Sequence, residues 1–220
     1  MKLEEIVPRV FHVNFETQIE LTSTFLRFQE HFESPKFKGK IFTLEEYKKW
    51  YTTNSKKGRE TGEFTYYTDW TGFNFPSTVL EPFYYGRFNP LSEAEEMVLT
   101  SFRDKRSTDF YVIGTYGKES RKDNALKHEI AHGLFFVNQR YRGEVIKVLH
   151  QIPSETRGKF NSFLGGLGGY HPDVWEDETH AYVVEGLDKL ERKHNVDVSG
   201  LRSFEPVMNE IFDRYTNQNN

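Results

Sequence analysis

Residues 128 to 132 have the sequence His-Glu-Ile-Ala-His. On an α-helix, residues four apart lie one turn apart on one face, so the side chains of His128 and His132 would point the same way. Two neutral imidazoles at this spacing can bind one metal ion at about 2.0 to 2.1 Å. Glu129 lies between them and could accept a proton from a nearby water. The segment therefore predicts a metal site with a general base, if it is helical and has a third ligand.

The surrounding sequence favours a helix from about residue 121 to 137. Ser120 is suited to cap its N-terminus, and Asp123 follows three residues later as a short capping-box partner. We expect one face of this helix to enter the core and the histidines to lie on an adjoining face, on the floor of a cleft. The alternative is two surface or core histidines that happen to lie four residues apart. The apolar residues recur at helical intervals, at Ala125, Leu126, Ile130, Leu134 and Val137.

The identity of the third ligand decides the kind of site. The metzincin extension HExxHxxGxxH would need Gly at 135 and His at 138, but the chain has Phe135 and Asn138 there. The gluzincin arrangement instead takes a Glu from a downstream helix, often within ExxA. The residues from Glu178 to Ala181 fit this pattern, 46 residues after His132.

The helical position of Glu178 gives an independent argument. At 100° per residue, Glu178 falls in the apolar sector of its helix, where a carboxylate is costly to bury unless it is paired or bound to metal. Asp177 lies at the edge of this sector and could hold a ligand histidine in one tautomer. Glu176 and His180 fall on the other side and are weaker candidates. The alternative for Glu178 is a half-buried carboxylate with a basic partner. The sector is shared by Val174, Trp175, Ala181 and Tyr182.

The chain here resembles the zincin metallopeptidases of the gluzincin type, in which two His and one Glu hold zinc as in thermolysin-like enzymes. This resemblance implies an α+β, helix-rich zincin-like fold with a small mixed sheet preceding the HExxH helix. It also implies one Zn²⁺ per chain and hydrolysis of a peptide or amide bond by a zinc-activated water, with Glu129 as general base. Asp177 stands where thermolysin-like enzymes have Asn, and Tyr182 where they have Asp, so these details are not carried over. The residues that carry the resemblance are His128, Glu129, His132, Glu178 and Ala181.

A further group is needed to stabilise the oxyanion that forms during hydrolysis. Related enzymes supply a Tyr or His from near the third-ligand helix, and here Tyr182 and His171 are the candidates, with Tyr170 beside His171. Each has a structural alternative: aromatic packing for Tyr182 and a solvated loop for His171. We expect His150 to be a surface residue.

Length and composition limit the domain organisation, the kind of partner and the location that we expect. The 220 residues suit a catalytic part from 106 to 220 with an aromatic-rich N-terminal elaboration from 1 to 105 packed on it, as one compact unit. The net charge of −4 does not favour nucleic acid as a partner, so the expected partner is a peptide or protein substrate.

Because there is no Cys, disulfides and thiolate metal sites are excluded. The chain lacks a long apolar run and an apolar N-terminal segment, so we expect no membrane association and a cytoplasmic location. The oligomeric state is left open.

Periodicity and caps predict the other elements. The aromatic-rich segment from 64 to 88 suggests short strands and turns, either packed beneath loops or forming a surface for peptide or sugar. The glycines from 165 to 169 suggest either a mobile lid or a plain connector. The other predictions are helices at about 16–33, 43–51, 92–103, 141–151, 155–163 and 203–215, a loop at 56–59 and a strand at 109–115.

Two other functions stay open. The chain could be a zincin scaffold that works as a binding or regulatory module, with the aromatic N-terminal half as its interface. The presence of Glu129 argues against this alternative, because a structural site does not need a base. The chain could also be a zinc hydrolase that acts on a non-peptide substrate.

Overall fold

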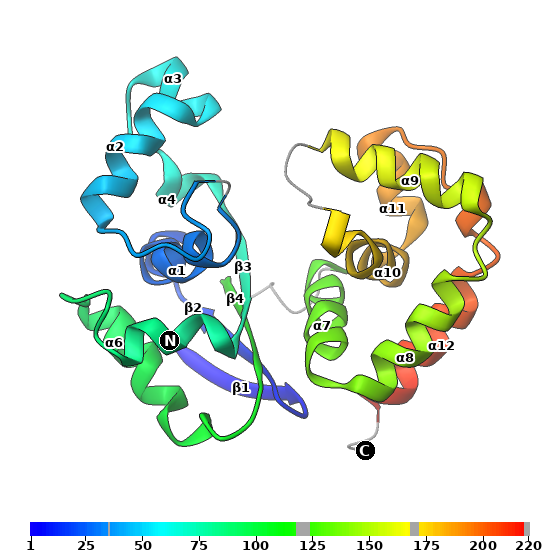
Figure 1. Cartoon of the computed structure of the whole chain (residues 1–220), viewed down its shortest axis with the longest axis horizontal. Helices are drawn as coiled ribbons and strands as arrows, with labels where there is room; N and C mark the ends of the chain where they lie inside the picture. Colours follow the sequence, from blue (N-terminus) through cyan, green and yellow to red (C-terminus); the bar gives the residue numbers. More distant parts are fainter. Residues whose placement is uncertain (35, 118–123, 168–171, 218–220) are drawn as a thin grey trace. The chain divides into compact units, whose positions relative to one another are not determined.

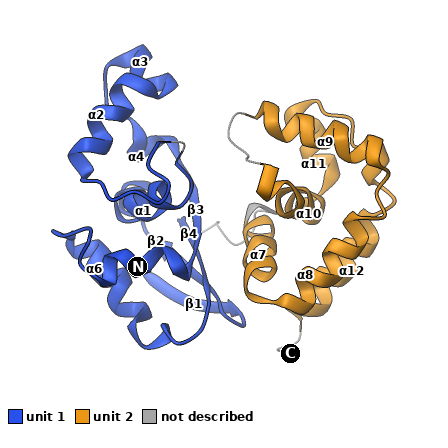
Figure 2. Cartoon of the chain, viewed as in Figure 1, with its two compact units in different colours: residues 1–120 blue, residues 121–220 orange. Residues whose placement is uncertain are grey.

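The computed structural model describes residues 1–34, 36–117, 124–167 and 172–217 (Figure 1). The fold is α+β and helix-rich with a small mixed sheet, which confirms the predicted fold class. The chain divides into two compact units, residues 1–120 and 121–220 (Figure 2). This boundary differs from the predicted division after residue 105, because the strand that follows residue 105 pairs within the sheet of unit 1. Across the described ranges, no helix has the length and apolar character needed to cross a bilayer.

Unit 1 is built on a four-stranded sheet with the order β1-β2-β4-β3. Strands β1 (Lys2–Val7) and β2 (Val10–Phe15) form an antiparallel pair. Strand β4 (Tyr111–Tyr116), which the sequence predicted, runs parallel to β2 and antiparallel to β3 (Gly72–Pro76). The sheet is therefore mixed, and its central pair joins segments about a hundred residues apart in the chain.

Three helices of unit 1 begin with complete capping boxes, in which the first residue and the third helical residue bond each other's backbone N–H groups. These motifs start the helices at the predicted places, which confirms the predicted helices near 16, 43 and 92. The helices are α1 (Gln18–Glu33), α2 (Leu44–Asn54) and α6 (Glu93–Phe102), capped by Thr17, Thr43 and Ser92.

The loop predicted at residues 56–59 is wrong. This segment forms the short helix α3 (Lys56–Thr61), because the Ser55 hydroxyl accepts a hydrogen bond from the backbone N–H of Gly58 and so provides a cap. Gly62 ends the helix in the left-handed conformation, with φ of 73°. The prediction of a solvated turn was based on the charged residues alone and did not consider Ser55 as a helix cap.

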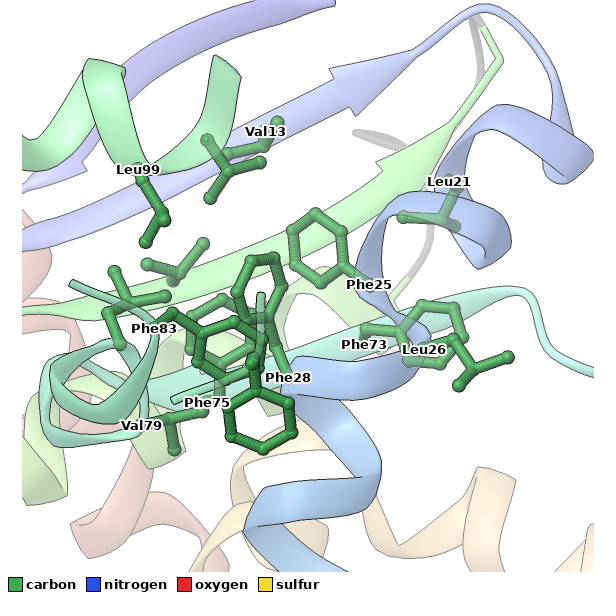
Figure 3. Packing of buried hydrophobic residues seen from close by; sticks show 14 of the residues in the cluster. Val13, Leu21, Phe25, Leu26, Phe28, Phe73, Phe75, Val79, Phe83 and Leu99 are labelled. Carbon is green, nitrogen blue, oxygen red and sulfur yellow. The ribbon is translucent and has the colours of Figure 1, made fainter. Parts of the chain in front are cut away.

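Helix α1 packs against β2, β3 and β4. Gly114 permits the close approach, because a Cβ atom there would lie 2.8 Å from Phe25 and 2.9 Å from Leu21. Aromatic rings fill the space around this contact, and Figure 3 shows Phe25 and Phe28 of α1 beside Phe73 and Phe75 of β3.

The aromatic-rich segment from 64 to 88 contributes most of its rings to this core, which confirms the packing interpretation. Trp70 and Tyr85 are exceptions, with 49% and 72% of their surface exposed. The segment is mainly short helical turns and contains one strand, so the prediction of short strands was only partly right. Its elements are α4 (Tyr66–Asp69), β3, the 3₁₀ turn η1 (Ser77–Leu80) and α5 (Glu81–Tyr84), and a further 3₁₀ turn, η2 (Arg103–Lys105), follows α6.

The regular elements described in unit 2 are helices. Helix α10 packs against α7, α8, α9, α11 and α12 and is the centre of the unit (Figure 2). The predicted helices are all present within a few residues of their expected bounds. The helices are α7 (Asn124–Val137), α8 (Gln139–Leu149), α9 (Ser154–Gly166), α10 (Trp175–Glu185), α11 (Leu187–His194) and α12 (Glu205–Thr216), with 3₁₀ turns η3 (Pro172–Val174) and η4 (Ser199–Leu201).

Two predictions near α7 and α9 fall partly outside the described residues. The expected caps Ser120 and Asp123 lie outside them, as does most of the glycine segment beyond Leu167. Gly165 and Gly166 form the last turn of α9 and do not belong to a loop.

Candidate metal centre

Helix α7 carries the HEIAH segment and places its two histidines one turn apart. Of the residues expected in the core, Leu134 is buried, whereas Leu126 and Ile130 are only half-buried. His132 is buried, with 6% of its surface exposed. The Nε2 atoms of His128 and His132 lie 3.0 Å apart, so both rings point to one place.

Helix α10 supplies the third member of the cluster. Glu178 is 9% exposed, and its carboxylate lies 3.7 Å (Oε1) from His132 Nε2 and 3.9 Å (Oε2) from His128 Nε2. One ligand atom from each of the three residues lies within 4.8 Å of the others. The structure therefore brings together the three residues that the sequence singled out as metal ligands.

The spacing of these atoms suits a tetrahedral zinc ion. Bonds of about 2.0 to 2.2 Å at tetrahedral angles separate ligand atoms by about 3.3 to 3.5 Å, and the three observed distances of 3.0, 3.7 and 3.9 Å lie on either side of that range. The Oε2 atom of Glu178 is buried and accepts no hydrogen bond from the described residues. A buried carboxylate oxygen without a donor is the environment that a cation stabilises.

Each histidine faces a carboxylate with its other ring nitrogen. Asp177 Oδ1 lies 3.0 Å from His132 Nδ1, and Glu185 Oε2 lies 3.3 Å from His128 Nδ1. A carboxylate at Nδ1 favours the tautomer with a proton there, which leaves the Nε2 lone pair available for a metal. The position of Asp177 is the one predicted from the sequence, whereas Glu185 was missed.

Glu185 could have been found from its spacing. It follows Glu178 by seven residues, which is two helical turns, so both project from the same side of α10. Lys189 lies 2.7 Å from the other oxygen of Glu185 and neutralises part of its charge. With Glu129 and Asp177, four carboxylates surround two imidazoles, which is a negative environment suited to a divalent cation.

Opposing effects set the protonation of the cluster. Burial disfavours charge on His132, but the neighbouring Asp177 and Glu178 outweigh it and raise the pKa of His132 to about 10. Burial raises the pKa of Glu178 to about 7 against the lowering influence of the two imidazoles. Burial would also raise the pKa values of Asp177 and Glu185, but neighbouring cations outweigh it. His132 lowers the pKa of Asp177 to about 2. His128 and Lys189 lower the pKa of Glu185 to about 2.

Glu129 is the predicted general base. It is half-buried on α7, and its negative charge acts on both His132 and Glu178, so it lies near the cluster. Glu129 is one residue from His128 and therefore starts from the same turn of the helix.

The two candidates for stabilising the oxyanion have different outcomes. The Tyr182 ring centroid lies 4.8 Å from that of His128, in an edge-to-face arrangement, so this residue lies beside the cluster. Tyr182 also contacts Phe160 of α9, which fits the alternative of aromatic packing. His171 and its neighbour Tyr170 lie outside the described residues. His150 is a surface residue as predicted, with its side chain 58% exposed and 3.1 Å from Glu176.

Two further positions explain why this site differs from the metzincin arrangement. Asn138, where a third histidine would stand, ends α7 and caps α8 by accepting hydrogen bonds from Arg140 and Tyr141 backbone N–H groups. Phe135, where glycine would stand, stacks against His180, with ring centroids 5.5 Å apart.

His180 is fully buried and is not one of the three clustered residues. Its Nε2 accepts or donates a hydrogen bond of 2.6 Å with the Tyr141 hydroxyl. The sequence placed His180 on the far side of α10 from Glu178 and gave no sign of this buried contact, because Tyr141 lies on another helix.

Comparisons with protein-family models, with curated proteins and with solved structures found no match to this chain. The chemistry of the cluster therefore rests on its own residues and geometry.

Proposed function

We propose that the protein is a zinc-dependent hydrolase, most specifically a metallopeptidase of the gluzincin type that cleaves peptide or amide bonds. One observation carries this proposal: both His Nε2 atoms converge on the Glu178 carboxylate while both Nδ1 atoms face carboxylates of α10. This arrangement supports three protein ligands to one zinc ion, His128, His132 and Glu178. Three ligands leave a fourth tetrahedral position open, as catalytic zinc sites do.

Bound zinc would supply positive charge that polarises the substrate carbonyl and lowers the pKa of a water. Glu129 is the residue proposed to accept the proton of the attacking water and to pass it to the leaving amine. Tyr182 is a candidate hydrogen-bond donor to the developing oxyanion, on the basis of its position beside His128. Asp177 and Glu185, at 3.0 and 3.3 Å from the Nδ1 atoms of the two imidazoles, would favour the tautomer that leaves each Nε2 free to bind the metal.

Activity is tested by digesting a broad peptide library with the zinc-loaded protein and with its Glu129→Gln variant. Removal of a general base typically lowers the rate by about 10² to 10⁴, so we expect cleavage by the wild type and almost none by the variant. Glu155→Gln is the control, because Glu155 is an exposed residue of α9 that pairs only with Lys159 among its described ion pairs. Equal, negligible peptide cleavage by wild type and Glu129→Gln would contradict peptidase activity and favour a binding module. Ester and non-peptide amide probes in the same assay distinguish a hydrolase of other substrates.

A further inference from the structure

A buried row of side chains extends from the proposed metal centre to helix α8. His132 Nδ1 lies 3.0 Å from Asp177 Oδ1, and His180 Nδ1 lies 3.6 Å from the same oxygen. The Tyr141 hydroxyl lies 2.6 Å from the other nitrogen of His180. His180 and Tyr141 are both completely buried. All four residues belong to unit 2.

The chemistry of these side chains indicates which atom donates and which accepts at each contact in the row. An ionised carboxylate can only accept, so a proton on Nδ1 of either imidazole is attracted to Asp177, at 3.0 Å from His132 and at 3.6 Å from His180. The Nδ1 atom of His180 has no other hydrogen-bond partner among the described residues. A neutral His180 that carries its proton on Nδ1 must accept at Nε2, and the donor is then the Tyr141 hydroxyl. Both side chains are completely buried, an environment that favours the neutral forms of the imidazole and the phenol.

The surroundings hold the His180 ring in place. Phe135 stacks on it with a centroid distance of 5.5 Å and an interplanar angle of 26°. Tyr141 meets it nearly edge-on, at 5.3 Å and 70°. The contact of 3.6 Å with Asp177 is longer than an N–H···O hydrogen bond, so this link is electrostatic. Held between two rings, His180 keeps its N–H group toward the carboxylate that faces His132.

We propose that Tyr141 and His180 are positioning residues of the metal centre, which act through Asp177 to hold His132 in the orientation and tautomer that present its Nε2 to the metal. This inference rests on the proposed zinc site and extends it to α8, three side chains beyond the ligand His132. Neither residue touches the metal or the substrate. Their effect is on the strength and geometry of metal binding, which is measured without any turnover.

The first test compares Tyr141→Phe with Tyr215→Phe in the full chain. Each substitution removes one hydroxyl, and the two rings are neighbours at 5.3 Å, but the Tyr215 hydroxyl donates to Glu144 and takes no part in the row. The readouts are the zinc dissociation constant, measured by competition with a chelating indicator, and the unfolding temperature of the metal-free protein. Loss of an outer partner of a metal ligand costs about 10- to 100-fold in affinity, so loss of a hydroxyl two contacts beyond that partner should cost about threefold to tenfold. We expect this loss in Tyr141→Phe and an unchanged constant in Tyr215→Phe.

The second test uses two substitutions of His180. The side-chain amide of Asn can donate from the position of Nδ1, so His180→Asn should keep zinc affinity close to that of the wild type. His180→Phe keeps the ring stacking but removes the donor, and it should weaken zinc binding at least as much as Tyr141→Phe. In the cobalt-substituted protein, the visible absorption bands should shift in His180→Phe and Tyr141→Phe but not in Tyr215→Phe, because only the first two release His132.

The outcomes separate this inference from the proposed function. If the wild type binds neither zinc nor cobalt, the metal site and the positioning role are both overturned. If the wild type binds zinc and Tyr141→Phe binds it equally well, only the positioning role is overturned. The same holds if Tyr215→Phe loses as much affinity as Tyr141→Phe, since the effect would then be a general loss of packing. Should His180→Phe fail to fold, the Tyr141→Phe comparison still decides.

Discussion

Glu185 Oε2 lies 3.3 Å from Nδ1 of His128, on the opposite side of the ring from the nitrogen that faces Glu178. Both carboxylates come from one face of α10, two turns apart, so a single helix contacts both sides of this imidazole. Glu185 is itself held by Lys189, 2.7 Å away on the next helix. A residue outside the HExxH and ExxA motifs therefore lies beside the second ring nitrogen of His128.

Glu185→Gln is expected to weaken zinc binding about 10-fold, the lower end of the usual cost of losing an outer partner. The amide keeps the size of the side chain but removes the charge that favours a proton on His128 Nδ1. Zinc affinity by chelator competition checks this, with the exposed Glu191→Gln on α11 as control. An unchanged affinity in Glu185→Gln would show that Glu185 does not orient His128.

Asp177→Asn should weaken zinc binding about 10- to 100-fold, because Asp177 faces His132 directly. The adjacent Glu176→Gln is a matched control, since Glu176 lies on the same turn but pairs with the surface residue His150. We expect Glu176→Gln to bind zinc like the wild type. Equal effects of the two substitutions would mean that charge on α10 matters but the position of Asp177 does not.

Zinc binding should strengthen as the pH rises, because the metal competes with protons for its ligands. His132, with a pKa raised to about 10, is protonated at neutral pH without metal and must lose its proton to bind zinc. Affinity should therefore rise about tenfold per pH unit between pH 7 and 8.5, and more steeply below pH 7, where Glu178 with a pKa of about 7 also holds a proton. Dissociation constants between pH 6 and 8.5 test this, and a flat profile would contradict it.

The metal-free protein should show the opposite trend in the contribution of His132 to stability. The pKa of His132 is raised in the folded protein, so its contribution is complete below the unfolded value near 6.5 and is lost as the pH rises toward 10. The lowered pKa of Asp177 adds stability above about 3.9, which is lost as the pH falls toward 2. Urea unfolding of metal-free protein from pH 6.5 to 9.5 should show falling stability, and the trend should be weaker in Asp177→Asn, where only Glu178 and Glu129 still raise the pKa of His132.

In unit 1, Glu95→Gln should destabilise the fold by about 3 to 5 kcal/mol, the usual cost of breaking a buried ion pair. The side chains of Arg27 and Glu95 are 9% and 4% exposed, and Arg27 also donates to the Phe88 and Pro90 carbonyls. Chemical unfolding measures the change. The exposed Glu155→Gln should leave the unfolding midpoint unchanged, and a similarly small effect in Glu95→Gln would contradict the expectation.

The sequence predicted local features best, because caps and motif spacing are set by nearby residues. The capping boxes at Thr43 and Ser92 placed α2 and α6, and the 46-residue step from His132 led to Glu178. The burial of the aromatic segment was also predicted. The caps are set by residues within one turn, whereas Glu178 was found because a motif spacing and its helical position both pointed to it.

Features that depend on pairing between distant segments were missed. The parallel pairing of β2 with β4 joins Val10 to Tyr111, and no local signal encodes that partner. The contact of Tyr141 with His180 requires α8 and α10 to pack side by side. Ile19, in the first turn of α1, follows the apolar periodicity of that helix in sequence and yet is 59% exposed.

The central claim is that His128, His132 and Glu178 hold one zinc ion, and metal analysis of the purified full chain tests it most directly. The comparison includes Glu178→Ala, its neighbour Glu176→Ala as the matched control, and Glu129→Gln. We expect about one zinc per chain in the wild type, Glu176→Ala and Glu129→Gln, and loss of zinc in Glu178→Ala. A wild type that carries no tightly bound divalent metal and gains none on titration with zinc, or a Glu178→Ala variant that keeps its full zinc content, would contradict the claim.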